Sequence, residues 1–334
     1  MSKVTLRTIA EKSGMSKYAV SRALAGKDGV SEATRQRILE IADSLGYKRP
    51  SPQMSQTREI VALFDDPLNV NTELHTQILG GLQQEASRLA MLVRVHWLHH
   101  ELPLEQVFKN SLGVAAVNLS QKHELKLMRD LDIPVVYTVR PEPFFPADVV
   151  SGADQESGAA VAEYLIGLGH REIVYVHGRE DLRGRILRLN GLRDIIERAD
   201  GVSLHDLRWK DVGGFSDAFS EHLESGGRPT ALFCAHDGLA LNAVTDLLSR
   251  GWKVPQDISV IGFGDYSVAR QIRPALTTVK TKGHEIGRAL MRLLHHRLSD
   301  DHWPEATMRI QIVNDLLVRG SCGSAPVVHP LDRT

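Results

Sequence analysis

The first 47 residues carry the pattern that most limits the fold of this chain: two short helices around a sharp turn, followed by a third helix. The spacing is set by Ile9, Ala10, Gly14, Met15, Val20 and Leu24. Ala10 is small enough for the second helix to cross closely above it, and Gly14 can take the positive φ that a tight turn between helices demands. Ser16 is placed to cap the second helix. The pattern therefore predicts a helix-turn-helix unit.

A third helix is expected after Ser31, whose hydroxyl can accept from a free backbone N–H, and Gly46 is expected to end it. Its apolar face is formed by Ile38, Ile41, Ala42 and Leu45. The three apolar faces can close a small core, which leaves the outer side of the second helix free for the major groove of DNA. That outer side carries Lys17, Tyr18, Ser21 and Arg22.

Basic charge is concentrated in the same part of the chain. Residues 1–60 contain 11 Lys and Arg against 6 Asp and Glu, a net charge of +5. Because the whole chain carries −1, the other 274 residues must carry −6. A DNA-binding surface needs cations for the phosphates, whereas a generic three-helix bundle with solvated charges does not. The charge distribution favours the DNA-binding interpretation.

The rest of the 334 residues is long enough for one large or two medium α/β domains. No run approaches the roughly 20 apolar residues that span a bilayer, and the N-terminus has no apolar signal region, so we expect a soluble cytoplasmic protein with no membrane partner. Cys234 and Cys322 are too few for a disulfide framework or a four-ligand zinc site. We expect Cys234, inside an apolar run, to be a small buried hydrophobe.

From Glu59 onward, short apolar runs alternate with amphipathic segments, which is typical of parallel sheets covered by helices on both faces. The runs are 60–64, 92–97, 115–119, 134–139, 173–176, 231–235 and 258–263, and the amphipathic segments include 74–89, 158–168, 239–248 and 286–298. So many runs indicate two lobes, with a ligand cleft between them beyond the carboxyl ends of the strands. Residues 48–59 are polar with two prolines and indicate a linker.

Two other classes of protein fit the sequence less well. An enzyme is disfavoured because the sequence has no Gly-rich phosphate loop, metal-binding helix motif or nucleophile elbow. The pairs His99–His100 and His295–His296 point to opposite sides of the elements that carry them, which disfavours a metal site. We therefore expect no cofactor and no catalytic residue. A periplasmic-type solute-binding or sugar-modifying protein without a DNA role would not carry a basic helix-turn-helix.

Short motifs occur along almost the whole chain: Val4–Leu6, Val20–Leu24, Gly29–Ser31, Leu45–Tyr47, Leu168–Arg171, Arg188–Gly191, Pro229–Ala231, Val254–Pro255, Ile258–Phe263 and Pro274–Val279. In these motifs the chain resembles the lactose/galactose repressor (LacI/GalR) family of bacterial transcription factors. The resemblance implies an all-α helix-turn-helix head on an α/β, two-lobed periplasmic-binding-protein-like core. It implies a regulator, expected to be a repressor, that binds a pseudo-palindromic double-stranded DNA operator as a homodimer. A small-molecule effector in the cleft would switch its affinity for DNA.

The resemblance also divides the chain into domains. It places the head at 1–47, a linker at 48–59, the core at 60–325 and a tail at 326–334. Lobe N is expected at about 60–165 and 282–313, and lobe C at about 166–281 and 314–325. The family's dimer interface corresponds to the surfaces near residues 74–89 and 266–272. The tail lacks the leucine heptads of a tetramerising helix, so a dimer is expected.

Carried over position by position, the resemblance assigns base reading to Lys17, Tyr18 and Arg22, and phosphate contacts to Thr5, Ser16, Ser21, Ser31 and Thr34. Arg22 can engage guanine O6 and N7 in a bidentate contact. A helix cap is the alternative role for each serine. The linker departs from the family, because Pro50 and Pro52 interrupt it and only Met54 could act as an apolar wedge. We expect weak or absent kinking of the operator.

The effector residues implied by the resemblance are Asp154, Arg188, Trp209 and Asp237. Three positions depart from the family: His236 replaces an Asn, Gly264 an Asp, and Gly283 an aromatic residue. Arg183 and Arg185, together with Arg179 and Arg140, add guanidinium groups near the cleft. Clustered guanidiniums favour carboxylate or phosphate, so we hypothesise a sugar acid or a phosphorylated metabolite rather than a neutral sugar. The alternatives are structural: helix caps for the two Asp, core packing for Trp209, and solvated or acid-paired arginines. The effector's identity, the sign of the switch and the operator sequence cannot be read from the sequence.

Overall fold

The computed structural model describes two compact units, residues 1–58 and 59–334. The described residues are 6–24, 31–45, 47, 58–65, 72–98, 103–119, 128, 131, 133–139, 144–178, 182–209, 214–299 and 306–332. Several predictions concern positions outside them: Thr5, Gly46, Arg140, Arg179, the pair His99–His100 and the linker prolines with Met54.

The N-terminal unit contains the three predicted helices, α1 (Leu6–Ser13), α2 (Lys17–Leu24) and α3 (Glu32–Ser44). Its core consists of Ile9, Val20, Ala23, Ile38 and Ala42, each at most 2% exposed. Gly14 has a φ of +70°, as the turn between α1 and α2 requires. The unit is small, but its three helices contact one another pairwise around this single core.

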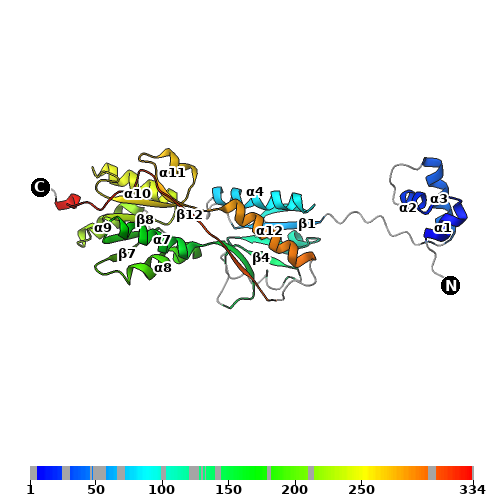
Figure 1. Cartoon of the computed structure of the whole chain (residues 1–334), viewed down its shortest axis with the longest axis horizontal. Coiled ribbons are helices and arrows are strands. Elements are labelled where there is room, and N and C mark those ends of the chain that lie inside the picture. Colours follow the sequence, from blue (N-terminus) through cyan, green and yellow to red (C-terminus); the bar gives the residue numbers. More distant parts are fainter. Residues whose placement is uncertain are drawn as a thin grey trace. The chain divides into compact units, whose positions relative to one another are not determined.

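The second unit is built on two six-stranded sheets with helices on both faces (Figure 1). The lobe N sheet has the order β11-β5-β4-β3-β1-β2, and all its strands are parallel. Its strands are β1 (Glu59–Phe64), β2 (Leu92–Trp97), β3 (Val114–Val117), β4 (Val135–Tyr137), β5 (Asp148–Gly152) and β11 (Arg309–Ile312). Helices α4 (Thr72–Arg88) and α12 (Gly283–Ser299) pack on one face, and α5 (Leu104–Phe108) packs on the other.

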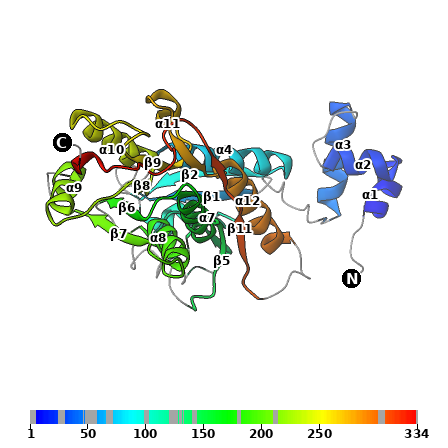
Figure 2. The same ribbon diagram turned by 60° about the vertical axis from the view of Figure 1, so that its left-hand side comes forward.

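The lobe C sheet has the order β12-β10-β9-β8-β6-β7, and only β12 is antiparallel to its neighbour. Its strands are β6 (Glu172–Gly178), β7 (Ser203–Arg208), β8 (Ala231–Cys234), β9 (Ser259–Gly264), β10 (Thr277–Lys280) and β12 (Asp315–Leu317). The helices of this lobe are α7 (Asp154–Gly167), α8 (Arg183–Ile196), α9 (Gly214–Glu224), α10 (Asp237–Ser249) and α11 (Ser267–Gln271), with a short 3-10 turn at Pro330–Asp332. The turned view in Figure 2 separates α7 and α8 from the α10 side of the sheet.

The boundary between the lobes differs from the prediction. Helix α7 was assigned to lobe N, but Val161, Ala162 and Leu165 are buried in the lobe C core, and α7 packs along α8. The crossover therefore lies near Ala153, not near residue 165. The chain also passes between the sheets after β10 and between β11 and β12. Glu59, predicted to end the linker, is the first residue of β1 and pairs with Arg94 at 2.8 Å.

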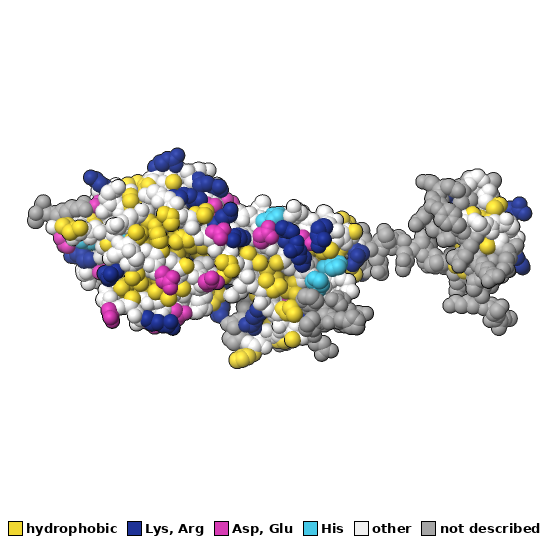
Figure 3. All heavy atoms as spheres, in the orientation of Figure 1, with side chains coloured by type: hydrophobic (Ala, Val, Ile, Leu, Met, Phe, Trp, Pro, Cys, Tyr) yellow, Lys and Arg dark blue, Asp and Glu magenta, His cyan; other side chains and the backbone are white. Residues whose placement is uncertain are grey.

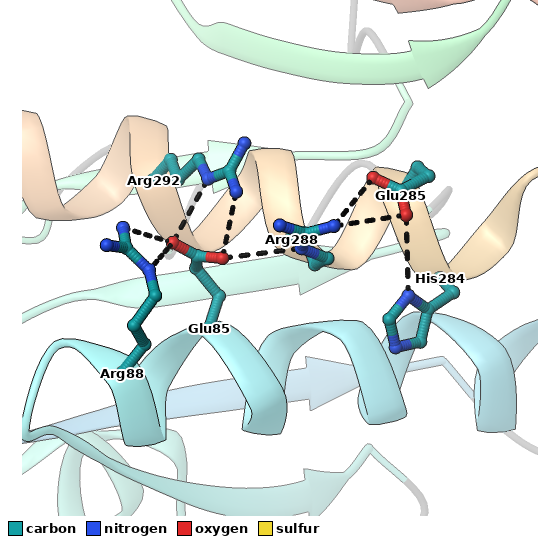
Figure 4. A network of polar contacts seen from close by, with 6 residues as sticks. All are labelled: Glu85, Arg88, His284, Glu285, Arg288 and Arg292. Carbon is teal, nitrogen blue, oxygen red and sulfur yellow. Dashed lines mark hydrogen bonds and ion pairs between the residues drawn. The ribbon is translucent and has the colours of Figure 1, made fainter.

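In lobe N, a buried carboxylate joins helices α4 and α12. Glu85 is 1% exposed and accepts from Arg88 of its own helix and from Arg288 and Arg292 of α12 (Figure 4). The three guanidinium groups lower the pKa of Glu85 to about 2, and the contact with Arg292 makes the largest contribution. Basic and acidic side chains consequently lie side by side over these helices on the face shown in Figure 3.

The two cysteines are free thiols, Cys234 buried and Cys322 half-buried. Among the described residues, none of the helices combines the length and the apolar character that a bilayer span requires.

Candidate DNA-binding head and effector cavity

In the head, two of the three serines predicted to reach phosphates, Ser16 and Ser31, act as helix caps. Ser16 Oγ accepts from Ala19 N at 3.1 Å, and Ser31 Oγ accepts from Thr34 N at 3.3 Å and contacts the Thr34 hydroxyl at 2.8 Å. These bonds fix the first turns of α2 and α3. Both hydroxyls remain at exposed positions. Lys17, Tyr18, Ser21 and Arg22, predicted to contact bases or phosphates, all belong to α2, but their side chains lie outside the described part of the structure.

A cavity of about 860 Å³ lies between the lobes of the second unit, where the strands of both sheets end. Lobe N contributes Leu74, Ile78, Asn118, Thr138, Val139, Val149, Ser151, Gly152, Thr281, Ile286, Arg309 and Gln311. Lobe C contributes Asp154, Gln155, Leu182, Arg183, Gly184, Arg185, Leu187, Arg188, Asn190, Ala235, His236, Phe263 and Tyr266. Its size fits a small metabolite, and its walls combine apolar surface with a few polar groups, as ligand sites do.

Arg188 is fixed at the centre of the lobe C wall. Its Nε donates to Asp154 Oδ1 at 2.8 Å, one of its terminal nitrogens donates to the carbonyl of Ala235, and its guanidinium carbon lies 3.5 Å from the centre of the Phe263 ring. Burial opposes the charge, but the Asp154 carboxylate more than offsets it and raises the pKa of Arg188 above its usual value. The arrangement holds a cation and a carboxylate together at the cavity wall.

Two glycines allow this geometry, because they let α7 and α8 approach backbone to backbone. A Cβ on Gly158 would lie 2.1 Å from the carbonyl oxygen of Arg188, and a Cβ on Gly191 would lie 1.9 Å from that of Gln155. No larger residue fits at either position without moving a helix. In the Arg188–Gly191 motif, Gly191 makes the close contact with α7 that positions Arg188, three residues before it.

His236 begins α10 at the edge of the cavity. Its Nδ1 accepts from the backbone N–H of Gly238 at 3.0 Å and of Leu239 at 3.3 Å, so the histidine performs the capping role of a shorter amide. Burial, followed by the nearby charges of Arg185 and Arg188, lowers the pKa of His236 to about 3. The ring is therefore neutral at physiological pH, with its proton on Nε2.

The other two arginines of the first turn of α8 differ from each other. Arg185 donates to the backbone carbonyl of His177 at 3.0 Å, and its own carbonyl accepts from the Tyr175 hydroxyl at 2.9 Å. Arg183 has no hydrogen bond or ion pair within the described residues, and its Nε is buried without an acceptor. The sequence grouped Arg183 and Arg185 as equivalent guanidinium groups, but in the structure only Arg185 is hydrogen-bonded to a described residue.

Two predicted effector residues do not line the cavity. Asp237 is fully buried, and its carboxylate accepts from Tyr266 N at 2.7 Å and from the Thr278 hydroxyl at 2.6 Å. Burial raises the pKa of Asp237 to about 6. Trp209 packs against the lobe C core. The position of Trp209 matches the core-packing alternative, whereas Asp237 does not cap α10, because His236 does.

The replacement of Asp by Gly at position 264 has a steric reason. Gly264 has a φ of +129°, and a Cβ there would lie 2.1 Å from the ring of Tyr266. Tyr266 itself lines the cavity. Gly264 therefore leaves room for the aromatic ring of Tyr266 in the cavity wall.

Several lining residues were missed by sequence reasoning. Arg309 and Gln311 lie on β11, a strand of four residues. Its only local signal in the sequence is the alternation of polar and apolar residues. Asn118 has a φ of +57° after β3 and exchanges hydrogen bonds with Thr138. Polar residues directly after strands β3 and β4 could have indicated this pair, because ligands bind beyond the carboxyl ends of parallel strands.

A helix-turn-helix unit followed in the chain by a two-lobed α/β unit with a cavity defines a DNA-binding regulator that responds to a small ligand. Residues 5–50 match the model of the bacterial regulatory proteins of the lacI family, and residues 162–322 match the periplasmic binding protein-like domain. The chain thus combines a helix-turn-helix domain of the lacI family with a periplasmic binding protein-like domain, as the sequence resemblance implied, and the predicted fold class is confirmed.

Relatives and solved structures align over most of the chain. The HTH-type transcriptional repressor CytR of Escherichia coli K12 is 27% identical and covers 96% of this chain and 97% of its own length. The repressor PurR of Vibrio atlanticus is 26% identical over 89% and 93% of the two chains. A complex of the regulator CelR with cellobiose is 26% identical, with a TM-score of 0.68 over 95% and 99%. The lac repressor dimer bound to operator and an anti-inducer shares the fold, at 21% identity and a TM-score of 0.70 over 97% and 100%.

Proposed function

We propose that this protein is a transcriptional repressor that binds a pseudo-palindromic operator as a homodimer, and that an acidic small molecule in the interlobe cavity switches its affinity for DNA. The observation that carries the proposal is the cavity itself, which takes its walls from both lobes. A ligand that contacts both walls favours one separation of the lobes over another. In a dimer, this difference alters the spacing of the two heads and hence their fit to the half-sites.

Charge supports an acidic effector. The described lining contains four arginines, Arg183, Arg185, Arg188 and Arg309, and one carboxylate, Asp154. The ring of His236 adds a hydrogen-bond donor and no charge. Phe263, which would otherwise offer an aromatic face to a sugar ring, is covered by the guanidinium of Arg188. A sugar acid or a phosphorylated metabolite suits this lining better than a neutral sugar.

Roles in the head follow from the position of α2. We propose that Arg22, Lys17 and Tyr18 read bases, and that Thr5, Ser21 and Thr34 contact phosphates. Ser16 and Ser31 cap helices and remain exposed, so each can also lie against the DNA backbone. Replacing Arg22 by Ala should cost about 1–3 kcal/mol of binding and relax specificity at one base pair.

The dimer is proposed to form through α4 and through the region around α11. A hydrogen-bonded contact within the chain joins these two surfaces, because Glu73 of α4 accepts from Ser267 of α11. Sedimentation at micromolar concentration tests the assembly. A monomer that still binds a palindromic site with full affinity would contradict it.

The function is tested by selecting DNA from a random pool with the full-length protein, followed by gel-shift titration of the selected site. A palindromic sequence is expected, with affinity that falls steeply as salt rises. Metabolites are then screened for those that release or strengthen the complex, and calorimetry compares matched neutral and acidic sugars. A chain that selects no sequence, or that binds the neutral sugar preferentially, contradicts the respective part of the proposal.

A further inference from the structure

We propose that the α8 end of the cavity is an anion subsite, in which Arg183 and the Nε2–H of His236 contact a carboxylate or phosphate group of the effector. Arg185 and Arg188, by contrast, shape the wall. The inference rests on the proposed function, because it concerns the same cavity. It names the two side chains of that cavity that distinguish charged from neutral ligands.

The first step is the state of the arginines. Arg188 is bonded to Asp154 and Ala235, and Arg185 is bonded to the His177 carbonyl. Their charge reaches the cavity, but these donors are already used within the protein. Removing either side chain would leave a buried acceptor without its partner, which disturbs the wall in addition to any effect on a ligand.

Arg183 is different. Within the described part of the chain its guanidinium has no hydrogen bond or ion pair, although it lines the cavity and its Nε is buried. A buried donor on a charged group without an acceptor is costly, and it becomes favourable when an anion enters. Arg183 is therefore placed to gain bonds on ligand binding without losing any that it makes with the described residues.

His236 supplies a second donor to the lining of the same cavity, and the charges of Arg185 and Arg188 act on it. Its Nδ1 is occupied by two backbone N–H groups, so the neutral ring can only donate from Nε2. The positive neighbours Arg185 and Arg188 and its burial keep the ring neutral. An Asn would cap α10 equally well but would not extend a donor so far. The exchange to His thus adds a ligand contact while preserving the cap.

The backbone adds to this donor set. Helix α8 begins at Arg183, and its cap residue Leu182 makes no side-chain hydrogen bond to the N–H groups of the first turn. The positive end of the helix dipole favours an anion there. The one carboxylate in the described lining, Asp154, is already neutralised by Arg188. Arg183, the Nε2–H of His236 and the first-turn N–H groups, the contacts that the described residues offer to this subsite, are all donors, which fits a carboxylate or phosphate and disfavours a hydroxyl that must also donate.

The test uses the full-length protein and simple anions, so the natural effector does not have to be identified first. Inorganic phosphate is titrated to about 50 mM at constant ionic strength while NMR follows the Nε2–H signal of His236. Glucose, glucuronate and glucose 6-phosphate are compared by thermal shift, which separates carboxylate from phosphate. We expect phosphate to shift the His236 signal, and the charged sugars to stabilise the protein more than glucose does.

Two variants probe the contacts, and a third is the control. Arg183→Gln removes the charge, and His236→Asn keeps the cap but loses the Nε2 donor. Each should weaken phosphate binding at least about tenfold. Arg193→Gln, at a half-exposed site on the same helix and outside the cavity, should change nothing. Thermal unfolding of each variant verifies that it is folded.

The proposal is overturned if phosphate leaves the His236 signal unmoved, if glucose stabilises the protein as well as the charged sugars do, or if Arg193→Gln weakens binding as much as Arg183→Gln. DNA binding is measured in parallel with the selected operator. If the chain binds that site but no anion, only the subsite fails. If it selects no DNA sequence, the proposed function fails as well.

Discussion

Glu73 of α4 accepts from the backbone N–H of Ser267 at 3.0 Å and from its hydroxyl at 2.6 Å, which links lobe N directly to the first residue of α11 in lobe C. Tyr266, the cap residue of α11, makes no side-chain capping bond, so the carboxylate from the other lobe satisfies the free N–H. Their chain neighbours, Leu74 after Glu73 and Tyr266 before Ser267, both line the cavity. A change in lobe separation must therefore act on this contact.

Replacing Glu73 by Ala should expose the Ser267 amide and loosen the link between the lobes. Because the contact is exposed, its loss should cost no more than about 1 kcal/mol of stability. Hydrogen–deuterium exchange at the start of α11 should become severalfold faster, while exchange in α8 stays the same. Unchanged exchange at Ser267 would show that the contact does not hold the lobes together.

Removing the buried carboxylate between α4 and α12 should destabilise lobe N. Glu85→Ala leaves three guanidinium groups without their shared acceptor, and we expect a loss of about 1–3 kcal/mol in the free energy of unfolding. Glu285→Ala is the control, because Glu285 contacts Arg288 too but is 48% exposed. It should cost less than about 0.5 kcal/mol. Urea unfolding measures both, and equal losses would argue against a role for burial.

The same carboxylate gives a pH dependence of known sign. Its pKa falls from 4.5 to about 2 on folding, so the stabilisation is complete above pH 4.5 and is lost as the pH falls toward 2. Wild-type stability should decline in that window more than that of Glu85→Gln, which cannot ionise. Parallel curves for the two proteins would exclude the carboxylate as a source of acid sensitivity.

Asp237 should act in the opposite direction. Its pKa is raised from 3.8 to about 6, so the folded protein holds a proton that the unfolded chain releases, and stability falls as the pH rises from about 4 to 6. The size of the effect should be of order 2 kcal/mol. Asp237→Asn should flatten this slope in thermal unfolding curves. A variant with the wild-type slope would place the titration elsewhere.

The close approach of α7 and α8 should tolerate no side chain at Gly191. Gly191→Ala places a Cβ against the backbone of Gln155, which should cost about 1–3 kcal/mol or more and shift Arg188 relative to Asp154. Gly167→Ala in α7 is the matched control, since nothing lies within 4 Å of its Cβ. It should be neutral or slightly stabilising. Equal melting temperatures for the two variants would refute the packing argument.

Most of the strands that the sequence predicted have continuous apolar runs, because their burial on both faces leaves a strong local signal. The exception is β2, an edge strand that is largely half-buried. Strands β5, β7, β10, β11 and β12 were missed. Of these, β7 and β11 lie at sheet edges and show polar, partly exposed patterns, and β12 has only three residues. Their positions are set by pairing with distant strands, which no local pattern reveals.

The candidate site was predicted only as far as family position and composition allowed. Asp154 and Arg188 lie together on the cavity wall, as expected. The motif that contains Arg188 also contains Gly191, which allows the close contact between α7 and α8. The number of arginines near the cleft could be counted in the sequence, but which ones were already bonded could not. The positions of Asp237 beneath Tyr266, and of Arg309 on the far lobe, depend on tertiary pairing.

The most direct test of the central claim compares the full-length protein with a chain that begins at Glu59, by gel shift on the DNA that the full-length protein selects. We expect the shortened chain to unfold cooperatively and still bind acidic ligands, because its core is a separate compact unit, but to give no shift at concentrations that saturate the full-length protein. Binding of the selected site with undiminished affinity by the shortened chain would contradict a DNA-reading head.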